Sequence, residues 1–129
     1  MEGGKDSRRT LGQEGEDIAC RLLEDRGHRI LERNWRSGHL EIDIISRDAD
    51  GIHFVEVKTR RQNIQAPPQY SVDISKQKRI VKAAQAYLRS RKGASARSEE
   101  CFFDIVAITC TGNSVCTEFI EQAFMPVFI

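Results

Sequence analysis

The chain has 129 residues, 40% of them hydrophobic and 30% charged, with a formal net charge of +1 at pH 7. That length suits a single domain, and that balance excludes both a disordered chain and a protein dominated by membrane-spanning helices. The first six residues are polar and no apolar run follows them, which predicts neither a secretory signal nor a membrane span and hence a cytoplasmic protein. We expect residues 1–10 to form a flexible N-terminus and residues 11–129 to form the domain.

Residues 11–26 carry apolar side chains at helical spacing, and Gly27 follows where a helix should end. At about 100° per residue, Glu16 projects close to Leu23, at the edge of the apolar stripe rather than among the other charges. Two interpretations fit this acid. It is turned toward a functional site, or it is an N-terminal acid that the helix dipole favours.

The next predicted elements are strands. Residues 28–35 fit a short strand in which we expect Trp35 to anchor packing. Residues 40–45 alternate with the period of two that is typical of a strand. The turn sequence at residues 48–51, Asp-Ala-Asp-Gly, leads into a second extended, β-branched run at residues 52–59. Together the two runs predict a β-hairpin.

A proline-containing loop is expected over residues 60–74, and Ser75 is the expected N-cap of a second helix at residues 76–92. Two further strands, joined by a Thr-Gly-Asn turn, are expected at residues 102–109 and 115–120. The predicted fold is therefore α/β, with a mixed central β-sheet flanked by helices in the order α-β-β-β-α-β-β.

The cysteines and histidines do not predict a metal site. The four cysteines have no C-x-x-C pair and no histidine at zinc-finger spacing, so we expect free thiols that are buried or half-buried. They are Cys20, Cys101, Cys110 and Cys116. The three histidines also lack metal-ligand spacing, and we expect surface or loop positions for them. They are His28, His39 and His53.

Basic charge is concentrated in one stretch. Residues 59–97 hold 10 Lys/Arg and one acid, whereas residues 1–58 hold 10 and 13, and residues 98–129 hold none and five. Fields at protein surfaces are screened over about 8 Å in physiological salt, so a polyanion senses this stretch rather than the net charge. It predicts a nucleic-acid contact, unless the helix only has a solvated basic face. The candidate contacts are Arg60, Arg61, Lys76, Lys78, Arg79 and Lys82.

The predicted hairpin can bring Asp43 opposite Glu56. Neighbouring strands lie about 4.8 Å apart, close enough for two carboxylates to share a cation and too close for both to ionise comfortably without one. Hard oxygen ligands of this kind suit Mg²⁺ or Mn²⁺. Lys58 follows Glu56 by two residues in an otherwise apolar strand, and a buried charge needs compensation. The alternative is a structural ion pair of Lys58 with Glu56 or Asp43.

Five motifs in order resemble the YraN (UPF0102) family, and they cover nearly the whole chain. They are Gly12-Gln-Glu-Gly15-Glu16-Asp17, Arg33-Asn34-Trp35-Arg36, Glu41-Ile-Asp43-Ile-Ile, Phe54-Val-Glu56-Val-Lys58-Thr-Arg60 and Phe103-Asp104-Ile-Val. That family resembles the restriction-endonuclease-like superfamily and is similar in core to the archaeal Holliday junction resolvases. The resemblance implies that fold and a nuclease of the PD-(D/E)xK type.

By this resemblance, Asp43 and Glu56 bind the metal with help from the Val57 carbonyl, and Lys58 orients or activates the attacking water. Glu16 matches the acid that resolvase-like enzymes carry on their first helix. Glu41 lies beside the site in a supporting role. The chemistry is consistent with these roles, because a metal ion offsets phosphate charge and lowers the pKa of a bound water, while a lysine stabilises charge that develops in the transition state.

The expected function is Mg²⁺-dependent endonucleolytic hydrolysis of DNA phosphodiesters, on branched DNA if the likeness to resolvases extends to the substrate. A symmetric homodimer would be the natural assembly on a two-fold junction. Two rival functions remain. One is a nucleic-acid-binding module that keeps the carboxylates without catalysis, and the other is an adaptor whose basic helix meets an acidic protein surface.

Overall fold

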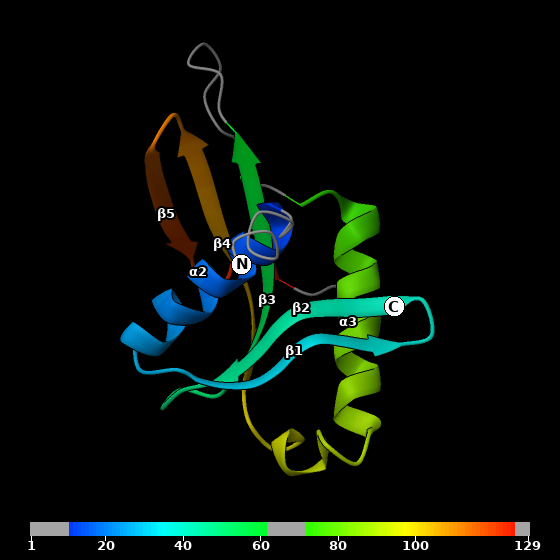
Figure 1. Ribbon diagram of the computed structural model, residues 1–129. Helices are drawn as coiled ribbons and strands as arrows, with labels where there is room; N and C mark the ends of the chain where they lie inside the picture. Colours follow the sequence, from blue (N-terminus) through cyan, green and yellow to red (C-terminus); the bar gives the residue numbers. More distant parts are fainter. Residues whose placement is uncertain (1–10, 62–71, 126–129) are drawn as a thin grey trace, which may run out of the picture.

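The computed structural model describes residues 11–61 and 72–125. Its elements are α2 (Leu11–Asp25), β1 (Arg29–Ser37), β2 (Leu40–Arg47), β3 (Ile52–Arg61), α3 (Ile74–Arg89), the 3₁₀ helix η1 (Ala94–Ala96), β4 (Cys101–Thr111) and β5 (Ser114–Ile120) (Figure 1). The predicted order of helices and strands is confirmed. The flexible N-terminus expected at residues 1–10 lies outside the described residues. None of the described helices is long and apolar enough to cross a membrane.

The strands form one mixed sheet in the order β1-β2-β3-β4-β5. Strand β3 pairs with β4 in parallel, while the other three pairings are antiparallel. Parallel neighbours need a long crossover, and the chain between β3 and β4 contains α3. The predicted hairpin of β2 and β3 is also present, with Arg47 opposite Ile52 at the turn and Ile44 opposite Val55 at the far end of the pairing.

The two long helices cover different faces of this sheet (Figure 1). Phe54 points into a cluster that includes the α3 residue Ala84, whereas the adjacent Val55 packs in a second cluster with the α2 residue Leu23. This alternation follows from the period of two along a strand. The predicted anchor Trp35 packs against the first cluster and contacts the ring of Tyr87 edge-on at a centroid distance of 5.3 Å. Both faces of β3 are therefore buried at their centre.

The ends of the helices follow local chemistry. Gly27 has φ +93° and the His28 N–H donates to the Leu23 carbonyl at 2.9 Å, so α2 ends as the sequence predicted. The prediction for α3 was wrong by two residues. Asp73, not Ser75, is the N-cap, because its carboxylate accepts a hydrogen bond from the Lys76 N–H at 2.8 Å.

All four cysteines are free, as predicted, but one of them is not buried. Cys116 is exposed, whereas Cys20 is buried and the other two are half-buried. The prediction was wrong for Cys116 because it lies on β5, the last strand at one edge of the sheet. Most residues of that strand face solvent.

Candidate active site

A polar pocket opens between β2, β3 and the first turns of α3. Its volume is about 210 Å³, and it is lined by His39, Leu40, Glu41, Asp43, Glu56, Lys76, Arg79 and Ile80. The pairing of β2 with β3 ends at Ile44 and Val55, so Asp43 and Glu56 are the first residues beyond it. In place of a ladder bond, the Val57 N–H donates to Asp43 Oδ2 at 2.9 Å. The structure thus brings Asp43 and Glu56 to one pocket, with Glu41 beside them.

The pKa of Asp43 is far above that of an ordinary aspartate. Burial raises the pKa of Asp43 to about 7, and the negative charge of Glu56 contributes to the rise. The Val57 N–H opposes this shift, while Glu16 and Glu41 add to it. With its pKa near 7 this group is only partly charged at neutral pH, and a bound cation would favour its charged form. The pocket therefore has the electrostatic character of a cation site.

Lys76 supplies the positive charge nearest to Glu56. Its Nζ lies 2.6 Å from Glu56 Oε2, and this hydrogen bond raises the pKa of Lys76. The sequence predicted Lys76 only as a nucleic-acid contact, but the structure places it in the wall of the carboxylate pocket. The reason is that α3 begins at Ile74, so its first turn borders the same pocket as Glu56.

The other predicted catalytic residues lie around this pair. Lys58 is half-buried, two residues after Glu56, and the alternation of β3 places both on one face. Glu16 on α2 accepts a hydrogen bond from Asn34 Nδ2 at 2.9 Å and lies 3.8 Å from Arg33 Nη2. It is not among the pocket-lining residues, yet its negative charge contributes to the raised pKa of Asp43. The structure therefore brings Glu16 near the pocket without placing it inside.

The predicted supporting acid and the basic residues differ in exposure. Glu41 is exposed and lies 3.4 Å from Arg36 Nη2. Arg60 is half-buried and Arg61 is exposed at the end of β3. On α3, Arg79 lines the pocket, while two exposed lysines four residues apart share a helix face outside it. These are Lys78 and Lys82.

The donor set fits a hard divalent cation. Two carboxylates meet at one pocket, and the N–H and C=O of one strand residue point to the same side, so the Val57 carbonyl faces the side of Asp43. Carboxylate and carbonyl oxygens are the ligands that Mg²⁺ and Mn²⁺ prefer. The residues that would hold the ion are Asp43, Glu56 and Val57.

Comparison with known proteins identifies the family. Residues 15–108 match the sequence pattern of "Uncharacterised protein family UPF0102". The chain belongs to the UPF0102 family. A UPF0102 protein of Nitratidesulfovibrio vulgaris (strain DP4) is 44% identical over 92% of this chain and 87% of its own length. UPF0102 proteins of Geobacter metallireducens and Bacteroides thetaiotaomicron are 41% and 38% identical, each over 90% of this chain and 93% of their own.

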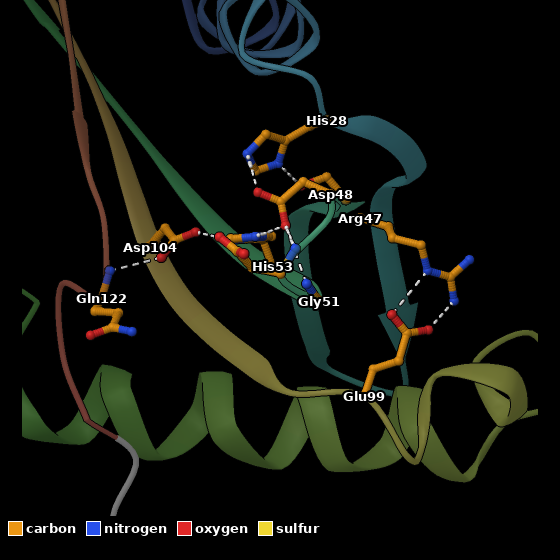
Figure 2. A network of polar contacts seen from close by, with 10 residues as sticks. His28, Arg47, Asp48, Gly51, His53, Glu99, Asp104 and Gln122 are labelled. Carbon is orange, nitrogen blue, oxygen red and sulfur yellow. Dashed lines mark hydrogen bonds and ion pairs between the residues drawn. The ribbon is translucent and has the colours of Figure 1, made fainter.

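The UPF0102 match contains all the residues around the pocket and also a second polar cluster that the sequence did not reveal (Figure 2). His39 is exposed in the turn between β1 and β2, as predicted. His28 and His53 are only 6% and 4% exposed, and His53 lies within β3, so the expected surface or loop position is wrong for it. Asp48 lies next to both rings, and Asp104 contacts His53 from β4.

The two buried histidines of this UPF0102 chain have opposite pKa shifts. Burial alone would lower the pKa of His53, but its hydrogen bonds to Asp104 and Asp48 outweigh burial and raise it. Burial lowers the pKa of His28, and the neighbouring His53 lowers it further. One sequence signal for this cluster existed. Asp48 begins the predicted turn at residues 48–51 and His53 follows that turn by two residues, so a hairpin keeps them at the same end of the strand pair.

Proposed function

We propose that the chain is a Mg²⁺-dependent endonuclease with a restriction-endonuclease-like fold, which hydrolyses phosphodiester bonds of DNA. The observation that carries this proposal is the pair Asp43 and Glu56 in one pocket, with the pKa of Asp43 raised to about 7. A divalent ion offsets the repulsion between two carboxylates in one site, and phosphate oxygens are natural further ligands of Mg²⁺.

Each residue has a role in this proposal. Asp43, Glu56 and the Val57 carbonyl would hold the ion. Bound Mg²⁺ supplies Lewis acidity toward the phosphate and lowers the pKa of a bound water. Lys58, on the same strand face as Glu56, stabilises the charge that develops on the phosphate oxygens. Lys76 balances Glu56 in the free protein and is free to turn toward phosphate once Glu56 binds the ion.

The substrate side of the proposal rests on the surface beside the pocket. Arg79 at the pocket wall and the exposed Lys78 and Lys82 extend positive charge along α3. A DNA backbone seated on this helix would bring a phosphate to the carboxylates. For a two-fold branched junction, the natural assembly is a symmetric dimer that offers two such sites.

The direct test is cleavage of linear, flapped and four-way DNA by the purified chain, with Mg²⁺, with Mn²⁺ and with a chelator. We expect cleavage of at least one of these substrates with metal and none with the chelator. Lys58→Ala should lower the cleavage rate by at least 100-fold, because a group that stabilises transition-state charge contributes about that much. Binding without cleavage in every metal would instead support the non-catalytic nucleic-acid-binding module.

The basic face of α3 makes a separate prediction about salt. Lys78→Ala combined with Lys82→Ala should weaken binding to all DNA sequences alike, because phosphate contacts position a protein without reading bases. Each lost contact should also reduce the slope of log affinity against log salt by about 0.9 on duplex DNA. Fluorescence anisotropy between 50 and 200 mM salt measures both effects.

A matched control removes two exposed charges from elsewhere, with Arg21→Ala combined with Arg29→Ala. Arg21 lies on α2 and Arg29 begins β1, away from the pocket-lining residues. This control should leave the slope nearly unchanged. Equal slopes for the α3 double variant and the unchanged protein would mean that α3 has only a solvated basic face.

A further inference from the structure

Four polar side chains form a chain of contacts at the turn end of the β2–β3 hairpin (Figure 2). Asp48 Oδ2 lies 3.5 Å from His28 Nε2, and Asp48 Oδ1 lies 2.8 Å from His53 Nε2. The Nε2 atoms of two buried histidines thus face one carboxylate. One ligand atom from each of His28, Asp48 and His53 lies within 4.8 Å of the other two.

The other ring nitrogens are already engaged. His28 Nδ1 lies 2.9 Å from Ser46 Oγ, and His53 Nδ1 lies 2.5 Å from Asp104 Oδ2. Asp104 is 1% exposed and is itself fixed by the Gln122 N–H at 2.8 Å. Histidines that bind metals almost always use the second ring nitrogen for such a hydrogen bond, which fixes the tautomer and the orientation of the ring. Both rings are therefore oriented with Nε2 toward Asp48.

One of the two histidine–carboxylate separations suits a tetrahedral ion. Two ligands each about 2.0–2.1 Å from such an ion lie about 3.4 Å apart. The separation of His28 Nε2 from Asp48 Oδ2 is 3.5 Å, close to this value, and that of His53 Nε2 from Asp48 Oδ1 is shorter at 2.8 Å. The 2.8 Å separation is that of a hydrogen bond, so His53 Nε2 and Asp48 Oδ1 would move apart when an ion replaces the proton between them. The Asp48 side chain is 18% exposed, so solvent can reach this carboxylate.

We propose that His28, Asp48 and His53 form a binding site for a divalent transition-metal ion of the Zn²⁺ type. Imidazole nitrogens suit such ions better than they suit Mg²⁺, so this site and the carboxylate pocket select different metals. Binding displaces the proton that His53 Nε2 shares with Asp48, and this proton leaves to solvent. The positive charge of the ion is balanced by Asp48 and by Asp104 behind His53.

This site is independent of the proposed nuclease pocket. Asp48 lies five residues from Asp43 along the chain, about 16 Å at 3.3 Å per residue of an extended strand. The proposed ligands also join three segments, since His28 precedes β1, Asp48 follows β2 and His53 lies in β3. A bound ion would therefore connect the start of β1 to the turn between β2 and β3. Its expected role is to hold these segments together.

The test is metal binding by the complete chain, first freed of metal with a chelator. Zn²⁺ is titrated against a chromophoric chelator, and Co²⁺ is used as a spectroscopic probe of tetrahedral coordination. The unchanged protein and Asp43→Asn, which removes a ligand of the other pocket, should both bind one Zn²⁺ with the intense visible bands of tetrahedral Co²⁺. His53→Asn should weaken Zn²⁺ binding by more than the roughly 10–100-fold that loss of an outer partner costs.

Two variants separate loss of a metal ligand from loss of folding and from removal of an unrelated histidine. Asp48→Asn keeps an oxygen that can accept the hydrogen bonds from the Asp50 and Gly51 N–H groups, yet removes the anionic ligand. It should weaken Zn²⁺ binding while the circular dichroism spectrum is kept. His39→Asn removes the exposed histidine and should leave Zn²⁺ affinity unchanged. Loss of Zn²⁺ binding in Asp43→Asn, but not in Asp48→Asn, would overturn the proposal.

A measurement on the unchanged protein decides the matter without any substitution. Nitrogen chemical shifts of the imidazole rings, recorded with and without Zn²⁺, should report metal at Nε2 of His28 and His53 and a retained proton at Nδ1 of His53. If neither histidine responds at saturating Zn²⁺, the cluster is only a hydrogen-bonded bridge between two carboxylates, and the proposal fails.

Discussion

Asp43→Asn should abolish metal-dependent cleavage and at the same time stabilise the metal-free protein at pH 8. Asparagine removes the charge that burial and Glu56 oppose, while its carbonyl can still accept the Val57 hydrogen bond. A pKa raised from 3.8 to about 7 corresponds to at most about 4 kcal/mol. Partial exposure of the carboxyl lowers this limit, so we expect a gain of about 2 kcal/mol in the free energy of unfolding.

The pH dependence has a definite sign. The folded state binds the Asp43 proton more tightly than the unfolded state, so the unchanged protein loses stability as the pH rises from about 4 to about 7. At pH 4, close to the unfolded-state pKa of 3.8, most of this loss has not yet occurred, so the advantage of the variant should be small. Urea unfolding with a chelator present, at pH 4, 6 and 8, measures this profile.

Controls separate the local effect from net charge. Glu118→Gln removes an exposed acid on β5 and should leave stability nearly unchanged at every pH. Saturating Mg²⁺ should stabilise the unchanged protein and not Asp43→Asn, because only a ligand that binds the folded state adds stability. Cleavage retained by purified Asp43→Asn would refute the catalytic role of Asp43. If the variant and the unchanged protein have the same free energy of unfolding at pH 8, the charged Asp43 is not destabilised by burial and by Glu56.

The hairpin shows how much of the site the sequence could specify. Once the turn sequence at residues 48–51 sets Arg47 opposite Ile52, counting along both strands leads to Ile44 opposite Val55 and next to Asp43 and Glu56. The convergence of the two acids therefore follows from local turn chemistry and a period of two. Neither depends on distant parts of the chain.

Contacts between distant segments could not be predicted in the same way. The ion pair of Lys76 with Glu56 depends on where α3 begins, and the N-cap of this helix is Asp73 although Ser75 is also a suitable residue. The histidine cluster joins residues from before β1, from the hairpin and from β4. Spacing rules for metal ligands apply within a motif, so they gave no signal for ligands that only tertiary structure brings together.

Gly15→Ala should destabilise the protein by about 2 kcal/mol, although alanine favours a helix over glycine. Gly15 is buried on α2, and a Cβ added there would lie 2.0 Å from Thr59 Oγ1 and 3.1 Å from Thr59 Cβ on β3. Alanine contributes up to about 1 kcal/mol of helix propensity. Overpacking costs about 1–3 kcal/mol or more, and a contact this short belongs to the upper end, because Thr59 Cβ and Cγ2 already lie 3.1 and 3.2 Å from the added Cβ.

A double-mutant cycle isolates this contact. Thr59→Ala removes Oγ1 and Cγ2, so Gly15→Ala in that background meets only Cβ at 3.1 Å and should cost at least 1 kcal/mol less than in the unchanged protein. Gly12→Ala, exposed one turn earlier in the same helix, is the matched control and should be neutral or stabilising.

Because Glu16 follows Gly15 directly, a helix pushed away from β3 also moves this acid away from Asp43. Gly15→Ala should therefore lower cleavage at temperatures where the variant is still folded. Full additivity of the two substitutions would show that Gly15 and Thr59 are not in energetic contact, and would remove the reason to expect Gly15→Ala to displace Glu16.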